Sequence, residues 1–303
     1  MVYRRDFRRN VVKRQPGLLS RWSVTWTLIV INVVLFFLFL FATLFFDSSI
    51  SFLSDWTNDS VKSTVLTDSL AVQPCHVLSG EKLWTIFTSM FMHAGFFHLF
   101  VNMFSLFFLG GLTERIIGRR RFFLFYLIAG LVGSLFFVFG AFGGQFFPHG
   151  SSLLGGIDSY AVGASGAIFG LLGVLAVLLP MKEIYLIVGP LIVLVLQVLI
   201  GKLPIASSVS GVIDVVASVL IFMMIFSVFS TNSFFRKLAL PLRLKFWLAP
   251  VIAILPLLVI GFFVELPIGN SAHLGGLVAG LVYGGYLRSK YRQKVKLLNR
   301  MVR

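Results

Sequence analysis

The 303-residue chain is short of charge, of acidic residues and of cysteine. Charged residues make up only 12% of it, against roughly 25% in soluble domains, and this deficit excludes a soluble enzyme. The one cysteine, Cys75, excludes an internal disulfide, a cysteine-based metal site and a secreted disulfide scaffold. A hydrophobic content of 58% excludes a disordered protein.

Apolar residues are abundant and fall in long runs. A membrane-spanning helix takes about 20 mostly apolar residues, and the chain holds eight candidate spans. The predicted spans are 24–46, 87–112, 122–147, 161–179, 184–200, 212–229, 246–264 and 270–287. We therefore expect an all-α fold, a polytopic membrane helix bundle. The fifth run is short and contains a Gly-Pro pair, so it could instead be re-entrant.

Basic residues flank these runs and indicate their orientation. With the N-terminus in the cytoplasm, 23 of the 26 lysines and arginines fall on the inner side. The outer side holds only Lys62, Lys82 and Lys202. The positive-inside rule therefore predicts an integral membrane protein with both termini cytoplasmic. The clusters should attract anionic membrane lipid. Nucleic acid is not an expected partner, because no basic segment forms a separate folded domain.

The same patterns predict the domain organisation. Residues 1–22 form a basic cytoplasmic segment, residues 23–288 the membrane domain and residues 289–303 a basic cytoplasmic tail. The first run is too long for the core of a cleavable signal peptide and is typical of a signal anchor. The polar stretch 47–83 is expected to be an external loop or short surface helices.

Strongly polar residues inside spans indicate function, because hydrocarbon does not tolerate them without a reason. His98, Ser165 and His273 each lie just beyond the outer start of their span, about 5–10 Å deep at a rise of 1.5 Å per residue. Asn102 follows His98 by one helical turn and projects from the same face. Asp214 is expected at head-group level, with a proton relay as the alternative.

Glycines provide a way for these helices to meet. Gly166 and Gly170 on the fourth span, and Gly276, Gly280 and Gly284 on the eighth, recur at four-residue spacing. Small residues at this spacing let membrane helices approach closely. A hydrogen bond of about 2.6–3.2 Å between a serine and a histidine on two helices needs such an approach.

The chemistry follows from these residue types. A neutral imidazole can accept the proton of a serine hydroxyl, and an oxyanion needs donors placed in advance. Candidate donors are His98, Asn102 and the backbone N–H of Ser165. These helices carry no carboxylate at this depth, which favours a Ser–His dyad. Taken singly, a Gly-x-Ser-Gly motif indicates helix packing and a histidine such as His93 a structural role; only the joint pattern indicates catalysis.

At this point the sequence resembles the rhomboid intramembrane serine proteases, over about residues 80–180 and 265–288. The matching motifs are His98-x-x-x-Asn102, Gly163-x-Ser165-Gly166, Ala272-His273-x-x-Gly276, Trp84–Thr88 and Glu114-x-x-x-Gly118. The sequence also departs from the family. Thr85 stands where many members have arginine, and Phe169 stands where a tyrosine is common. Two extra spans are predicted between the serine and histidine helices of a six-helix core.

The resemblance implies a function. Ser165 would be the nucleophile and His273 the general base, with His98, Asn102 and the Ser165 N–H forming the oxyanion hole. Substrates would be single-span membrane proteins, cleaved in or near their transmembrane helix at a site opening to the outer face. No cofactor and no metal are implied.

The family motifs also indicate which residues support the site. These are Gly163, Gly166, Phe169 and Gly276. The alternative is an inactive rhomboid-like protein that binds membrane clients without cutting them. A transporter is a more distant alternative, because the sequence shows no clear internal repeat.

Overall fold

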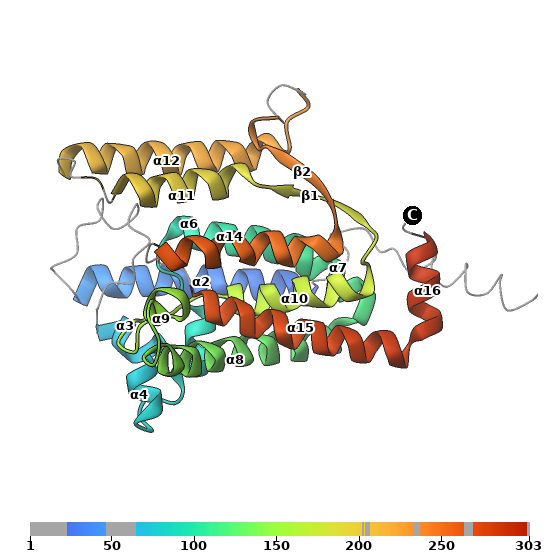
Figure 1. Ribbon diagram of the computed structural model, residues 1–303, viewed down its shortest axis with the longest axis horizontal. Helices are drawn as coiled ribbons and strands as arrows, with labels where there is room; N and C mark the ends of the chain where they lie inside the picture. Colours follow the sequence, from blue (N-terminus) through green and yellow to red (C-terminus); the bar gives the residue numbers. More distant parts are fainter. Residues whose placement is uncertain are drawn as a thin grey trace, which may run out of the picture.

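The computed structural model shows a bundle of mostly aligned helices (Figure 1). It describes residues 23–46, 65–201, 203, 207–232, 237–263 and 269–301. The predicted basic segment 1–22 and residues 47–64 of the predicted external loop lie outside the described residues.

The elements follow one another along the chain as helices interrupted by one pair of strands. The first half contains α2 (Val24–Phe46), α3 (Val65–Leu70), α4 (Pro74–Leu78), α5 (Thr85–Thr88), a 3-10 turn η1 (Ser89–Phe91), α6 (Phe96–Ser105), a π-helical segment η2 (Leu106–Gly110), α7 (Gly111–Ile117), α8 (Arg119–Gly144) and α9 (Gly150–Leu154). The second half contains α10 (Ser165–Leu178), β1 (Glu183–Ile187), α11 (Gly189–Gly201), α12 (Ser207–Ser227), β2 (Pro241–Lys245), η3 (Phe246–Leu248), α14 (Ala249–Phe263), α15 (Asn270–Lys290) and α16 (Arg292–Met301).

The helical membrane bundle that the apolar runs predict is confirmed. By length and composition, three helical stretches of the described residues are long and apolar enough to cross a membrane: Val24–Thr43, Phe96–Ile117 and Arg119–Gly144. Shorter apolar helices include Ser165–Leu178 and Phe246–Phe262. The count of eight spans stays a prediction.

A two-stranded antiparallel ribbon departs from an all-α fold. β1 pairs with β2 in a register that sets Glu183 opposite Lys245 and Tyr185 opposite Arg243. The sequence Ile-Tyr-Leu-Ile of β1 consists largely of β-branched and aromatic residues, which favour strands. The predicted fifth span, 184–200, is therefore wrong at its start, because residues 184–187 belong to strand β1 and the helix begins at Gly189.

Two predicted spans also begin later than expected. The second, 87–112, becomes a continuous helix only at Phe96, because Gly95 is fully extended. The fourth, 161–179, begins as a helix at Ser165, after a turn in which Gly163 has a positive φ. The described part of the predicted external loop contains the short helices α3 and α4, as expected. The predicted basic tail contains α16, which lies across the end of the bundle (Figure 1).

Helix α10 lies at the centre of the bundle, packed between α8 and α15. It runs parallel to α15, with Gly166 beside Gly276 and Gly170 beside Gly280. A Cβ atom on Gly276 would lie 1.9 Å from the carbonyl oxygen of Gly166, and one on Gly280 would lie 2.1 Å from that of Gly170. The two backbones therefore touch, and only glycine fits at these contacts.

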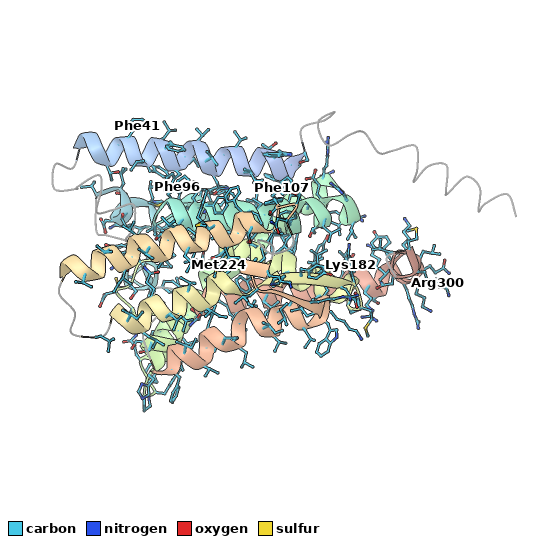
Figure 2. The ribbon with its side chains drawn as sticks, turned by 90° about the horizontal axis from the view of Figure 1, so that it is seen from above. Phe41, Phe96, Phe107, Lys182, Met224 and Arg300 are labelled. Carbon is cyan, nitrogen blue, oxygen red and sulfur yellow. The ribbon has the colours of Figure 1, made fainter. Side chains whose placement is uncertain are left out.

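Helices α11 and α12 form a hairpin on the outside of α6 and α14 (Figures 1 and 2). The Phe100 ring of α6 packs against Phe222 and Phe226 of α12, with centroids 5.3 and 5.5 Å apart. Inside the hairpin, the side-chain amide of Gln197 donates a 2.8 Å hydrogen bond to the carboxylate of Asp214. Asp214 thus has a partner on the neighbouring helix, as polar groups between membrane helices require.

The backbone contact between α10 and α15 generates a stability prediction. Gly276→Ala should lower the free energy of unfolding by about 1–3 kcal/mol, because the new methyl group forces the helices apart. Gly285→Ala on the same helix is the matched control, since its Cβ would meet nothing within 4 Å. It should be neutral or stabilising by up to about 1 kcal/mol. Thermal unfolding in detergent measures both, and equal stability of the two variants would contradict the close approach.

Candidate active site

Ser165 is the first residue of α10, and the chain reaches it through a constrained turn. Gly163 has a φ of +122°, a conformation that L side chains rarely adopt. Its N–H donates a 2.8 Å hydrogen bond to the carbonyl of Ser89. The first N–H groups of a helix have no partner within it, so this end of α10 presents donors next to the Ser165 hydroxyl.

His273 lies one turn inside α15 and meets Ser165 across the glycine contact. Its Nε2 is 2.8 Å from the Ser165 Oγ. The two residues belong to parallel helices that begin at the same end of the bundle, and Gly276 lies one turn further along α15. The close approach of Gly166 and Gly276 therefore sets the separation between the hydroxyl and the imidazole.

The other nitrogen of His273 has no acidic partner in the part of the chain that the structure describes. Among the described residues, Nδ1 is buried without a hydrogen-bond partner. The orientation of the ring comes from Phe169, whose ring stacks on the imidazole with centroids 4.3 Å apart and planes 14° apart. Phe169 follows Ser165 by one helical turn. One turn of α10 thus supplies both the Ser165 hydroxyl and the Phe169 ring against which the imidazole stacks.

His98 approaches the same place from α6. Its Nδ1 accepts a hydrogen bond from the N–H of Ala94 at 3.4 Å, and a neutral imidazole with an acceptor at Nδ1 carries its proton on Nε2. That Nε2 faces Gly163, because a Cβ atom there would lie 2.8 Å from it. His98 therefore presents an N–H donor to the turn that precedes Ser165.

Asn102 lies one turn below His98 on the same face of α6. Its side-chain Nδ2 donates a 2.9 Å hydrogen bond to the carbonyl of His98, and it would lie 3.8 Å from a Cβ atom at Gly163. The side chain is buried, with 4% of its surface exposed. One of its two amide hydrogens is used within the helix, which leaves the other as a second donor at this turn.

Two further residues at the site did not emerge from the sequence analysis as functional. The ring of His93 packs edge-on against His98, with centroids 5.3 Å apart. Gly133 of α8 lies behind the helix crossing, where a Cβ atom would lie 2.9 Å from the Ala272 carbonyl oxygen and 3.3 Å from the Cα of Gly166. The signal for Gly133 was present in its four-residue spacing from Ala129, with the small residues Gly130 and Ser134 next to the pair.

The first turn of α15 is also fixed by contacts with α9 and α14. The hydroxyl of Ser271 donates a 2.5 Å hydrogen bond to the carbonyl of Leu154 in α9. Asn270 is buried beside Gly261 of α14, where a Cβ atom would lie 3.1 Å from its Nδ2. Contacts with α9 and α14 therefore fix the start of α15, and His273 follows these contacts by two and three residues.

These groups form a set with a definite chemical capacity. The hydroxyl of Ser165 lies within hydrogen-bond distance of an imidazole and stands at a helix N-terminus. A side-chain imidazole and a side-chain amide face Gly163, two residues before it. Such a set can transfer a proton from the hydroxyl and hold a negative oxygen. The nucleophilic, basic and oxyanion-binding roles of Ser165, His273, His98 and Asn102 stay predictions.

Comparison with known proteins identifies related sequences. Residues 80–215 and 205–290 match the family model described as the Rhomboid domain. Rhomboid protease GluP of Bacillus subtilis is 35% identical over 125 residues, covering 41% of this chain and 21% of that protein. RHOMBOID-like protein 1 of Arabidopsis thaliana is 39% identical over 97 residues, covering 32% of this chain and 21% of that protein.

A further relative is named as an inactive protein. Inactive RHOMBOID-like protein 8 of Arabidopsis thaliana is 43% identical over 58 residues, covering 19% of this chain and 16% of that protein. The chain spans between 21% and 42% of the length of the first curated relatives it matches.

The tight fit of Gly163 against His98 generates a second prediction. Gly163→Ala should lower the free energy of unfolding by more than Gly80→Ala. Both glycines have positive φ, which costs an L residue about 1–2 kcal/mol. Only at Gly163 does the added Cβ also meet a ring, since nothing lies within 4 Å at Gly80. Chemical unfolding curves compare the variants, and a smaller loss for Gly163→Ala would show that His98 does not pack there.

Proposed function

The chain belongs to the rhomboid family, and we propose that it is an intramembrane serine endopeptidase that cleaves single-span membrane proteins in or near their transmembrane helix. The observation that supports this most directly is the 2.8 Å contact between Ser165 Oγ and His273 Nε2. Both residues stand within the stretch that matches the Rhomboid domain.

In the proposed first step, the Ser165 oxygen attacks the carbonyl carbon of the scissile peptide bond. His273 Nε2 accepts the hydroxyl proton as the new C–O bond forms, which leaves an imidazolium and a tetrahedral oxyanion. The Phe169 ring, stacked on the imidazole, stabilises the imidazolium by a cation–π interaction. This contact substitutes for part of the orienting role that a carboxylate performs in a triad.

The oxyanion is held by donors that need no reorganisation. His98 Nε2–H, the Asn102 amide and the backbone N–H of Ser165 are the proposed donors. The positions of His98 and Asn102 beside Gly163, two residues before Ser165, are consistent with this proposal. The tetrahedral intermediate then breaks the C–N bond. His273 returns its proton to the leaving amine, and the acyl group remains on Ser165 as an ester.

Deacylation repeats the sequence with water. A water molecule gives its proton to His273 Nε2 and adds to the ester carbonyl, and the same donors hold the second oxyanion. Collapse of this intermediate breaks the ester bond, the proton returns to the Ser165 oxygen, and the carboxylic acid leaves. No step needs a group beyond the chain, the peptide and water.

The chain is an integral membrane protein, and the proposed orientation places both termini in the cytoplasm. The support is the charge distribution, with basic residues concentrated on the predicted inner side. Lys182 and Arg300 lie toward one end of the bundle (Figure 2), away from the ends of α6, α10 and α15 that carry the site (Figure 1). In this orientation the site opens to the outer face.

The second candidate function is an inactive rhomboid-like protein that binds membrane clients. One of the matching relatives is named as inactive, which supports this second candidate. The retained Ser165 and His273 favour the protease.

Cleavage of a reconstituted single-span substrate tests the choice between the two functions. Wild-type protein should release two fragments, whereas Ser165→Ala and His273→Ala should each lower kcat by at least roughly 10³-fold, because the two residues act as a unit. Fragment bands are quantified by gel electrophoresis. Binding of substrate without cleavage by wild type would favour the inactive alternative, and undiminished cleavage by Ser165→Ala would exclude the proposed nucleophile.

The oxyanion role of Asn102 can be tested against a matched residue. Asn102→Ala should lower kcat by about 10²–10³ with little change in KM, as expected for loss of a donor to the oxyanion. Asn32→Ala in α2 is the control, because Asn32 is also buried and makes the same hydrogen bond to the carbonyl one turn earlier. Steady-state kinetics should show that only Asn102→Ala affects turnover. Equal losses in both variants would indicate a purely structural role.

A further inference from the structure

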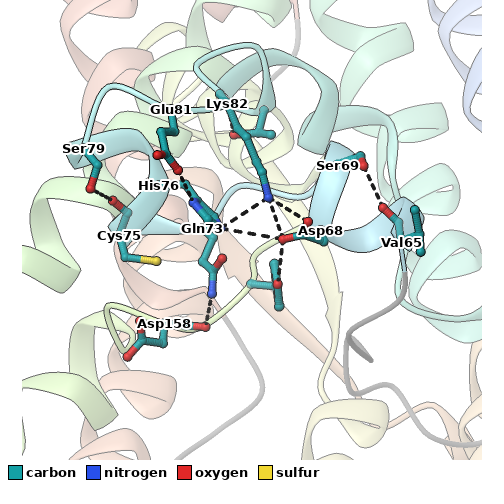
Figure 3. Close-up of polar contacts among 12 residues, drawn as sticks. Val65, Asp68, Ser69, Gln73, Cys75, His76, Ser79, Glu81, Lys82 and Asp158 are labelled. Carbon is teal, nitrogen blue, oxygen red and sulfur yellow. Dashed lines mark hydrogen bonds and ion pairs between the residues drawn. The ribbon is translucent and has the colours of Figure 1, made fainter.

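A polar network ties the external segment, residues 65–89, to the loop that leads into Ser165 (Figure 3). At its centre, Lys82 Nζ donates hydrogen bonds of 2.7 Å to both carboxylate oxygens of Asp68. The hydroxyl of Tyr160 donates to the same carboxylate at 3.2 Å. His76 lies beside this pair, with its Nε2 3.3 Å from Lys82 Nζ and 3.7 Å from an Asp68 carboxylate oxygen. Its Nδ1 lies 2.9 Å from a carboxylate oxygen of Glu81.

The residues of this network come from three separate parts of the chain. Asp68 belongs to α3, Lys82 to the turn before α5, and Tyr160 to residues 157–163, here named the site loop. Lys82 has a φ of +45°, which is uncommon for a residue other than glycine. A backbone held in a sparsely populated conformation needs surrounding contacts to keep it there.

Backbone hydrogen bonds continue the connection. Val72 and Ala161 exchange hydrogen bonds of 3.1 and 2.9 Å, as in a short antiparallel ladder. The N–H of Cys75 donates to the carbonyl of Ile157 at 3.0 Å. The side chain of Gln73 donates to the carbonyl of Asp158 at 2.8 Å. The site loop is therefore attached to the external segment at several successive residues.

The far end of the site loop enters the proposed catalytic machinery. Gly163 is fixed by its N–H bond to Ser89 and lies directly against the His98 ring. Ser165 follows two residues later. A displacement of the loop at Tyr160 would therefore move Gly163 relative to His98 and change the position of Ser165.

The ion pair of Lys82 and Asp68 is suited to positioning the site loop rather than to raising the free energy of unfolding. The hydrogen bonds from Lys82 lower the pKa of the Asp68 carboxyl below its ordinary value, which favours the charged carboxylate that pairs with Lys82. The side chains of Lys82 and Asp68 are 23% and 42% exposed. Ion pairs this exposed contribute little to global stability, so their loss should leave the fold intact.

We propose that Asp68, Lys82 and Tyr160 are positioning residues that hold the site loop against His98 and thereby set the geometry of Ser165. The proposal rests on the proposed protease function. It assigns a catalytic consequence to residues that the sequence motifs leave unexplained. The competing interpretation is a solvated ion pair that has no effect on the site.

The test compares Lys82→Met, Asp68→Asn and Tyr160→Phe with the control Glu81→Gln. Within the described part of the chain, Glu81 bonds to His76 and not directly to the Asp68–Lys82 pair. The first readout is the second-order rate constant for labelling of Ser165 by a fluorophosphonate, together with kcat and KM for a single-span substrate. Lys82→Met and Asp68→Asn should each lower the labelling rate and kcat about tenfold, with KM and the thermal unfolding midpoint nearly unchanged. Tyr160→Phe should have a smaller effect in the same direction.

Rescue and coupling distinguish positioning from a general structural role. Lys82→Arg should recover most of the labelling rate, because it restores the cation. The double variant Lys82→Met/Asp68→Asn should be no slower than either single variant, because the residues act together. Unchanged labelling in Lys82→Met, or an equal fall in Glu81→Gln, would overturn the proposal. So would a loss that follows the unfolding midpoint and is not rescued by arginine.

A second readout is independent of activity. Hydrogen exchange at the amides of Ala161 and Gly163 should become at least tenfold faster in Lys82→Met and remain unchanged in Glu81→Gln, because the ion pair restrains the site loop. Exchange unaffected by Lys82→Met would contradict the positioning claim even if the enzyme is active. Absence of fluorophosphonate labelling in wild type, with exchange behaving as expected, would instead reject the protease function.

Discussion

The contact between the backbones of α10 and α15 is the constraint on which the rest of the site depends. Gly166 and Gly276 allow two helix axes to come closer than any side chain would permit. Ser165 and His273 lie at the same end of this contact. The separation of the two helices therefore determines the distance between the hydroxyl and the imidazole, which is 2.8 Å. A short hydroxyl–imidazole separation is thereby built from rigid helices, because no side chain lies between their backbones at the glycine contacts.

Around this contact, each remaining polar group is held by a different element. Phe169 orients the His273 ring from α10 itself, and the Ala94 N–H fixes the tautomer of His98. The site loop connects the external segment to Gly163. The arrangement meets the general requirement that polar groups among membrane helices have partners or a function. Among the described residues no carboxylate pairs with His273, and stacking on Phe169 orients the imidazole without adding a buried charge.

Much of this could be predicted from the sequence because hydropathy and glycine spacing are local signals. The apolar runs predicted the helical bundle, and the equal depths of His98, Ser165 and His273 predicted that they could meet. The ribbon of β1 and β2 could not be predicted, because its strands are 53 residues apart between Ile187 and Pro241 and a short apolar run suits strand or helix equally. The hydrogen bond from Tyr160 to Asp68 and the contact of Gly133 with Ala272 are likewise long-range, so periodicity within a segment does not reveal them.

The central claim, that Ser165 is a nucleophile activated by His273, is tested most directly by trapping the covalent intermediate. Wild-type protein is mixed with a single-span substrate, quenched in acid within one turnover and digested for mass spectrometry. We expect the peptide containing Ser165 to gain the mass of the N-terminal substrate fragment as an ester, and His273→Ala to show no such adduct. An adduct on another residue, or cleavage that proceeds with no adduct at any time point, would contradict it.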